Sequence, residues 1–241
     1  MSDRVGVGDR PATRDGFPHS AHPFTRATAG RLAVAAAAIA TVLVAAGFLV
    51  RYASVSLSYS DGRVSRWFEA NRVEPWDSLT HVGSTLANTE TAIAVAIIAM
   101  LSVRLWLTRW HEAIVLGIAL AGEVIIFLTV VTIVQRPRPP VFRMDPAPPT
   151  SSFPSGHTAA ATVVYGFIAF VIWRYVSHRW AATIATLLLV MVPVAVGLSR
   201  LYRGAHFLTD VIAGAVLGIV WMAVVIRTLL PEHRHVAAPT G

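Results

Sequence analysis

Six long apolar runs dominate this sequence of 241 residues and restrict the folds open to it. A helix needs about 20 apolar residues to cross a bilayer, and lipid leaves only helices or closed barrels with a satisfied backbone. The fourth run is short and compatible with a buried helix, but its charged borders favour a span. The sequence therefore predicts an all-α integral membrane protein, a six-transmembrane-helix bundle, with spans near 31–50, 86–107, 112–134, 157–173, 180–198 and 207–228.

The composition agrees with a membrane protein and excludes several kinds of site. The chain is 55% hydrophobic and 14% charged, with a mean hydropathy of +0.60, which is too apolar for an ordinary soluble domain. It contains no cysteine, so disulfides and thiolate metal sites are excluded. The net charge is +7, but the arginines are scattered between apolar runs. This pattern favours contact with membrane lipids over nucleic acid.

Six spans place both termini on one side of the membrane. Residues 1–30 are predicted to be a flexible cytoplasmic tail, 31–228 a membrane domain and 229–241 a polar cytoplasmic tail. With the tails inside, eleven arginines lie on the inner side and nine on the outer side. Without the four arginines of the polar motifs described below, the ratio becomes eleven to five, which favours cytoplasmic termini.

The longest outer loop, residues 51–85, carries aromatic residues among charges. Within it, Trp67, Phe68 and Trp76 lie in the stretch SRWFEANRVEPWDSL. Aromatic side chains beside charges are typical of headgroup depth. We therefore expect a short amphipathic helix in the interface.

Three polar segments interrupt the apolar pattern. They are QRPRPP at 135–140, TSSFPSGHT at 150–158 and SRLYRGAHFLTD at 199–210. Counting spans places all three at the same membrane face.

The second segment predicts an anion site at the start of a helix. Pro154 ends the incoming chain, Ser155 and Gly156 can begin a helix, and His157 falls on its first turn. The free amides and the dipole of a helix N-terminus attract anions. Gly156 is expected to let the anion approach the main chain closely.

The third segment predicts a histidine activated by a carboxylate. His206 and Asp210 are four residues apart at the expected start of the last span, so they would share a helix face. A carboxylate that accepts from one ring nitrogen leaves the other free to attack. That span would supply a second helix N-terminus, with Ser199, Arg200 and Arg203 on the loop before it.

Together these residue types indicate phosphoryl transfer. Arginine forks match phosphate oxygens, one imidazole can attack phosphorus, and the other can protonate the leaving oxygen. The sequence offers no carboxylate cluster of the kind that holds magnesium, so we expect neither a metal nor a cofactor.

These motifs resemble the type 2 phosphatidic acid phosphatase (PAP2) superfamily of membrane lipid-phosphate phosphatases. The family motifs are K-x6-R-P, P-S-G-H and S-R-x5-H-x3-D. The second is complete at Pro154–His157 and the third is complete at Ser199–Asp210. The resemblance covers roughly residues 50–228.

The resemblance implies a role for each matched residue. His206 would form a phosphohistidine, Asp210 would orient it, and His157 would protonate the leaving group. The phosphate would be bound by Arg138, Arg200, Ser155, Gly156 and Ser199. The family fold is a six-helix membrane bundle, and bacterial members of the family act on lipid phosphates without a metal. With both termini in the cytoplasm, the matched residues would form a site on the outer face of the plasma membrane.

The first motif departs from the family pattern. Arg138-Pro139 matches its R-P, but Val131 then stands at the lysine position. Taking Arg136-Pro137 instead gives Thr129, which is also uncharged. Another arginine could replace the lysine, and the candidates are Arg136, Arg143 and Arg203.

The leading interpretation is a phosphatase for a lipid phosphomonoester or pyrophosphate. Its substrate would be polyprenyl (pyro)phosphate, phosphatidate or phosphatidylglycerol phosphate. Two alternatives stay open: a non-enzymatic lipid-phosphate binding or transport protein with a degenerate site, and a phosphotransferase to a lipid acceptor. No sequence feature indicates an oligomeric state.

Overall fold

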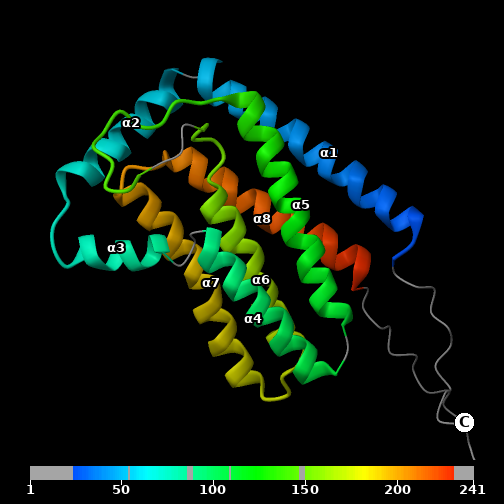
Figure 1. Ribbon diagram of the computed structural model, residues 1–241. Helices are drawn as coiled ribbons and strands as arrows, with labels where there is room; N and C mark the ends of the chain where they lie inside the picture. Colours follow the sequence, from blue (N-terminus) through cyan, green and yellow to red (C-terminus); the bar gives the residue numbers. More distant parts are fainter. Residues whose placement is uncertain (1–23, 54, 86–88, 109, 147–149, 231–241) are drawn as a thin grey trace, which may run out of the picture.

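The computed structural model describes residues 24–53, 55–85, 89–108, 110–146 and 150–230. These residues form eight α-helices and a π-helical turn, η1, and no β-strand (Figure 1). In chain order they are α1 (Arg26–Phe48), η1 (Leu49–Ala53), α2 (Val55–Ala70), α3 (Trp76–Thr85), α4 (Thr89–Leu107), α5 (His111–Val134), α6 (Gly156–Tyr175), α7 (Arg179–Tyr202) and α8 (Leu208–Leu229).

Six of the described helices, α1 and α4 to α8, are long and apolar enough to cross a membrane. The prediction of a six-span all-α membrane protein is confirmed. The short fourth span is α6, and half of its apolar stretch is buried inside the bundle, more than for any other span described. It packs against α4, α5, α7 and α8. Its central position explains why this run is less apolar than the other five spans described.

Close packing of α6 on α8 brings their N-terminal ends together. A Cβ on Gly214 of α8 would lie 2.3 Å from the carbonyl oxygen of Ser155, and one on Gly218 would lie 2.6 Å from Cβ of Thr162. Only glycine allows this approach, and small residues at helix interfaces are common in membrane bundles. The contact matters for function because the second and third polar segments of the sequence lead into these two helices.

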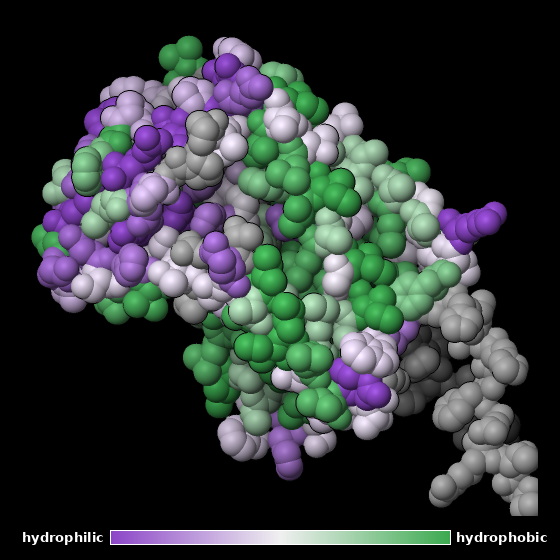
Figure 2. Space-filling model, viewed as in Figure 1, coloured by the Kyte–Doolittle hydropathy of each residue, from purple (hydrophilic) through white to green (hydrophobic). Residues whose placement is uncertain are grey.

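The outer loop forms two helices where the sequence predicted one. Within the stretch expected to be a single helix, α2 ends at Ala70 and α3 begins at Trp76. The intervening residues form turns and include Pro75, which cannot continue an α-helix. Figure 2 shows hydrophilic residues gathered over the end of the molecule where α2 and α3 lie, whereas hydrophobic residues cover the bundle. We call this end the polar cap; it consists of α2, α3, residues 135–146 and 150–155, and residues 199–210 at the connection between α7 and α8. Its placement in a membrane interface stays a prediction.

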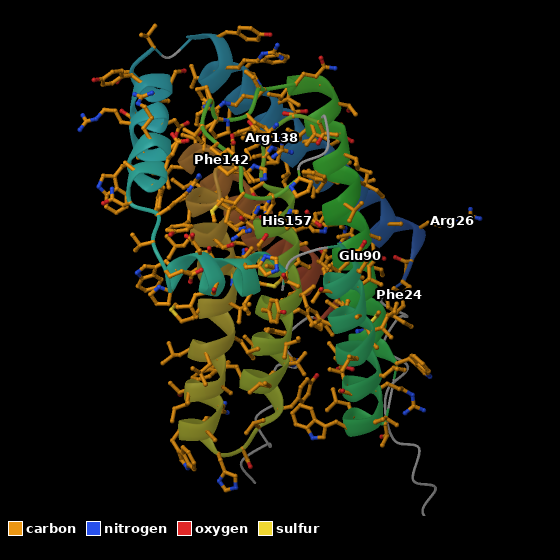
Figure 3. All side chains as sticks on the ribbon, turned by 60° about the vertical axis from the view of Figure 1, so that its left-hand side comes forward. Phe24, Arg26, Glu90, Arg138, Phe142 and His157 are labelled. Atoms are coloured by element: carbon orange, nitrogen blue, oxygen red, sulfur yellow. The ribbon has the colours of Figure 1, made fainter. Side chains whose placement is uncertain are left out.

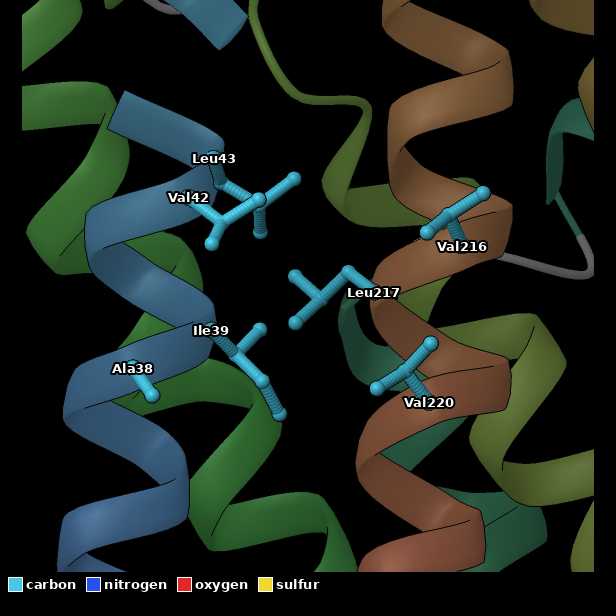
Figure 4. A pocket seen from close by; sticks show the side chains of 7 residues that line it. All are labelled: Ala38, Ile39, Val42, Leu43, Val216, Leu217 and Val220. Atoms are coloured by element: carbon cyan, nitrogen blue, oxygen red, sulfur yellow. The ribbon is translucent and has the colours of Figure 1, made fainter. Parts of the chain in front are cut away.

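The surface of the bundle also carries an apolar groove between α1 and α8 (Figure 4). All of its lining side chains are aliphatic. Such a surface suits contact with acyl chains. The residues that line it are Ala38, Ile39, Val42, Leu43, Val216, Leu217 and Val220.

Candidate active site

The structure brings the three polar segments together in the polar cap. The amide of Ser152 donates to the carbonyl of Arg136 (2.9 Å), and the amide of Ser155 donates to the carbonyl of Asp210 (2.9 Å). The amide of Met144 donates to the carbonyl of Arg203 (3.1 Å). These backbone hydrogen bonds tie the loop after α5 to the start of α6 and to the connection between α7 and α8.

His206 lies in this connection, buried at 4% exposure. Its Nδ1 is 2.7 Å from the carbonyl oxygen of Ser152, which can only accept, so Nδ1 carries the proton and Nε2 is the nitrogen with a free lone pair. Burial lowers the pKa of His206 below its ordinary value, and it outweighs the carboxylate of Asp210, which acts in the opposite direction. The charges of Arg200 and Arg138 lower the pKa further. His206 is therefore a neutral imidazole with a nucleophilic nitrogen.

The relation of His206 to Asp210 differs from the prediction. α8 begins at Leu208, so His206 precedes the helix and the two residues do not share a helix face. The distance from Nδ1 of His206 to Oδ2 of Asp210 is 3.7 Å, too long for a hydrogen bond. The main-chain oxygen of Ser152 fixes the tautomer instead, and Asp210 acts on His206 through its charge.

Carboxylates occupy the N-terminus of α8, which the sequence analysis expected to be a second anion site. Oδ2 of Asp210 accepts the amide of Phe207 (2.9 Å), and Oδ1 of Asp61 accepts the amide of Thr209 (3.2 Å). Asp61 also accepts the hydroxyl of Thr209. These two amides are therefore satisfied by carboxylates of the protein, and a phosphate at this helix start would meet their negative charges.

Arg136 joins these two carboxylates. Its Nη2 is 2.8 Å from Oδ2 of Asp61, and its Nη1 is 2.5 Å from Oδ1 of Asp210. Nη1 also donates to the hydroxyl of Thr209 (2.8 Å), and the guanidinium lies over the ring of Phe207. The arginine was a candidate phosphate ligand, but both of its Nη nitrogens are bound to buried carboxylates within the protein.

Arg138 and Arg200 each have an N–H donor without a partner among the described residues. Nη1 of Arg138 donates to the carbonyl of Ala205 (2.8 Å), and Nη1 of Arg200 donates to the hydroxyl of Ser84 (2.5 Å). The Nε of each is buried and has no hydrogen-bond partner among the described residues. Since a buried unpaired donor costs free energy, these two nitrogens are suited to an acceptor from outside the protein. Both charges act on His206.

The other two candidates for a replacement cation differ from each other. Arg203 is bound to Asp145, with Nε to Oδ2 and Nη2 to Oδ1 each at 2.6 Å. Arg143 is exposed and has no carboxylate partner among the described residues. Its charge lowers the pKa of Arg138, after the larger effect of burial. Of the three candidates, Arg143 is the one whose charge is not neutralised within the described chain.

α6 begins where the sequence predicted, but the side chains at its start make different contacts from those expected. Ser155 is its N-cap and makes no side-chain cap hydrogen bond. Its hydroxyl is paired with that of Thr158 (3.0 Å). The first amides of α6 are thus not taken by the cap side chain, and His157 lies on the first turn. Figure 3 shows Arg138 and Phe142 toward the same end of the bundle as His157.

Glycine at 156 is required by packing. A Cβ there would lie 2.8 Å from the ring of Phe127 on α5. The expectation that Gly156 serves the approach of an anion is therefore not needed to explain this residue. Ser199 likewise points elsewhere, because its hydroxyl donates to the carbonyl of Thr80 on α3 (2.7 Å).

Val131, at the position of the family lysine, is buried in the bundle at 5% exposure. α5 ends at Val134, and its C-cap Gln135 has a left-handed backbone (φ 47°) that directs the chain into the prolines. In the described part of the chain, no three histidine or carboxylate side chains lie together where they could hold a metal ion.

The sequence analysis missed two acidic residues of this site. Asp61 lies in α2 and Asp145 in the loop before α6, far in sequence from the arginines that they bind. Each stands outside the motifs, and no local spacing links either of them to its partner. The one signal was charge itself, since both lie in segments rich in arginine.

Comparisons with known proteins agree with this arrangement. Residues 110–234, just over half of the chain, match the family model of the PAP2 superfamily. The chain belongs to the PAP2 superfamily. The matched residues include α5 to α8 and the three polar segments of this PAP2 protein.

One curated relative of this PAP2 chain is phosphatidylglycerophosphatase B from Bacillus subtilis (strain 168), with 38% identity over 72 residues. The matched region is 28% of this chain and spans only about a third (34%) of that relative.

Two solved structures share the fold. One is a transmembrane PAP2 type phosphatidylglycerolphosphate phosphatase from Bacillus subtilis, with a TM-score of 0.69, 21% identity, and 80% of this chain and 92% of that chain covered. The other is Aquifex aeolicus LpxE, with a TM-score of 0.52, 21% identity, and 68% of this chain and 93% of that chain covered.

Proposed function

We propose that this protein is a membrane phosphatase that hydrolyses the phosphomonoester or pyrophosphate of a lipid. One observation carries the proposal: a neutral histidine, with the lone pair on Nε2, lies within the electrostatic reach of two arginines, and the buried Nε of each arginine has no hydrogen-bond partner in the described part of the chain. Donors without acceptors beside a nucleophile suit a phosphoryl group. The name of the relative, phosphatidylglycerophosphatase B, supports a lipid phosphate as the substrate class.

The reaction would take two steps. Nε2 of His206 attacks phosphorus and forms a P–N bond while the P–O bond to the lipid breaks. His157 gives its proton to the leaving oxygen. It then takes a proton from a water molecule, whose oxygen bonds to phosphorus while the P–N bond breaks, so that phosphate is released and both histidines return to their starting states. Arg138, Arg200 and the first amides of α6 would hold the phosphate oxygens through both steps. Asp210 balances the charge that develops on His206, from 3.7 Å away.

The placement in the cell is part of the same proposal. Residues 31–228 would form the phosphatase domain in the plasma membrane, with both termini in the cytoplasm and the polar cap on the outer face. The excess of arginine on the opposite side supports this orientation.

The test is phosphate release from a panel of lipids by purified protein in detergent with EDTA present. The panel contains phosphatidate, phosphatidylglycerol phosphate, and polyprenyl phosphate and pyrophosphate, and His206→Ala is the control. We expect release from at least one lipid by the wild type alone. Equal release by the variant would refute the proposal. Phosphorylated products formed with added alcohol acceptors would show transfer in place of hydrolysis.

A further inference from the structure

Asp145 connects three parts of the polar cap through a single carboxylate. Both of its oxygens accept from Arg203 at 2.6 Å. Oδ2 also accepts from the hydroxyl of Ser84 on α3 (3.0 Å) and from Nη1 of Arg200 (3.3 Å). Burial alone would raise the pKa of Asp145, but the hydrogen bonds from Arg203 and Ser84, together with the charges of Arg203 and Arg200, outweigh it and lower the pKa. The group is therefore a carboxylate throughout the neutral range.

Its two arginine contacts are unequal. The contact with Arg203 is bidentate and short, which is the strong geometry for guanidinium and carboxylate. The contact with Arg200 is a single bond at 3.3 Å, and Arg200 keeps a buried Nε with no partner among the described residues. Asp145 thus holds Arg203 firmly and Arg200 only weakly, and Nη1 of Arg200 has its shorter contact with the hydroxyl of Ser84.

The carboxylate also resembles the ligand that Arg200 is proposed to bind. A carboxylate and a phosphate both present acceptor oxygens to a guanidinium, and a bound phosphate carries the larger negative charge. The side chain of Asp145 is 18% exposed, so the anion can be reached from solvent. An arriving phosphate would compete with Asp145 for Nη1 of Arg200 and would meet its negative charge.

We propose that Asp145 is a positioning residue that holds Arg203 and Arg200 in place and weakens the binding of phosphate to Arg200. The inference rests on the proposed function, since it concerns the same phosphate site. In the substrate-free protein Asp145 shares the charge of Arg200. When phosphate binds, Nη1 of Arg200 turns to it and Asp145 keeps Arg203. After hydrolysis Asp145 takes Arg200 back, which favours release of the product phosphate.

The test is the affinity of Asp145→Asn for two anions, inorganic phosphate and orthovanadate, measured by titration calorimetry on full-length protein in detergent. Asparagine keeps the shape of the side chain and removes its charge. We expect Kd for both anions to fall by about three- to tenfold, the range given by one charge close to a partly screened site. In turnover assays of Asp145→Asn, KM should fall together with Kd. Because the product phosphate is released more slowly, kcat should not rise.

The matched control is Glu69→Gln, which removes a carboxylate of the same polar cap. Glu69 accepts the amide of Phe142 (2.6 Å) and is not among the described hydrogen-bond partners of Arg200. Its Kd should stay within about twofold of the wild-type value. Asp145→Glu, which retains the charge, should also stay close to the wild type. Asp145→Ser replaces the asparagine variant if that variant does not fold.

A purely structural role would have a different signature. The neutral variants would then lose thermal stability while Kd stayed the same or rose, and that result overturns the inference. Wild-type protein that binds neither anion would refute the proposed function itself. Wild-type binding that does not become tighter in Asp145→Asn refutes only the role of Asp145.

Discussion

Removing the charge of Arg136 should destabilise the polar cap strongly. Arg136→Met leaves Asp61 and Asp210 facing each other, and these side chains are 3% and 0% exposed. Breaking a buried ion pair by removing one partner costs about 3–5 kcal/mol. Part of this cost falls directly on the site, because Asp210 also caps α8 and acts on His206.

The magnitude can be read from thermal unfolding. In a chain of this size about 1 kcal/mol corresponds to roughly 2–4 °C in apparent Tm, so we expect Arg136→Met to lower Tm by about 6–20 °C. The control is Arg66→Met on α2, an exposed arginine outside the ion pairs, which should change stability by less than about 0.5 kcal/mol. The double variant Asp61→Asn with Arg136→Met should lose less than the sum of its parts, since one carboxylate is then neutral.

The same experiment separates two roles for Arg136. A phosphate ligand would lose affinity for orthovanadate with little change in Tm. A buried structural partner loses stability first, and affinity only as far as Asp210 and His206 move. If Arg136→Met unfolds at the same temperature as Arg66→Met, the ion-pair argument is wrong.

Three further predictions follow from individual contacts. Gly156→Ala should lower the free energy of unfolding by about 1–3 kcal/mol because its Cβ would meet the ring of Phe127, and adding Phe127→Leu should restore part of that stability. An unchanged free energy of unfolding in Gly156→Ala would contradict the packing argument. As the pH falls, kcat/KM should begin to drop only below pH 6.5, the ordinary pKa of histidine, because the neutral imidazole of His206 is the reactive form and burial lowers its pKa. A drop that begins above pH 6.5 in a pH profile of activity would contradict this prediction. If the site has one cation fewer than other PAP2 sites, Val131→Lys should have a lower Kd for orthovanadate than Val131→Met, whose side chain is neutral and of similar length. Equal Kd values for the two variants would indicate that an arginine such as Arg143 already supplies that charge.

The sequence predicted the membrane architecture well because lipid imposes strict rules. The six apolar runs map onto α1 and α4 to α8, and counting spans correctly predicted that the three polar segments meet. The prediction of one helix in the outer loop was wrong. Its hydrophobic and charged residues lie partly in α2 and partly in α3, and Pro75 lies in the break between the two helices. No periodic pattern marks a break of this kind.

The site was harder to predict because its partners are far apart in sequence. Motif spacing indicated His206 and Asp210, yet it suggested a helix face where the structure has a loop followed by α8. The acceptor for Nδ1 of His206 is a main-chain oxygen of Ser152, which no residue type can reveal. Arg136 looked like a phosphate ligand because Asp61, its partner on α2, is 75 residues away. Long-range pairing of charges is a property of the packed structure rather than of the motif.

The most direct test of the account is whether phosphate becomes covalently attached to His206 during turnover. Purified protein is mixed with a lipid substrate carrying labelled phosphate and quenched, and the labelled peptide is identified by mass spectrometry. We predict label on the peptide containing His206 in the wild type and none in His206→Ala. Label on another residue, or turnover by His206→Ala at the wild-type rate, would contradict the central claim.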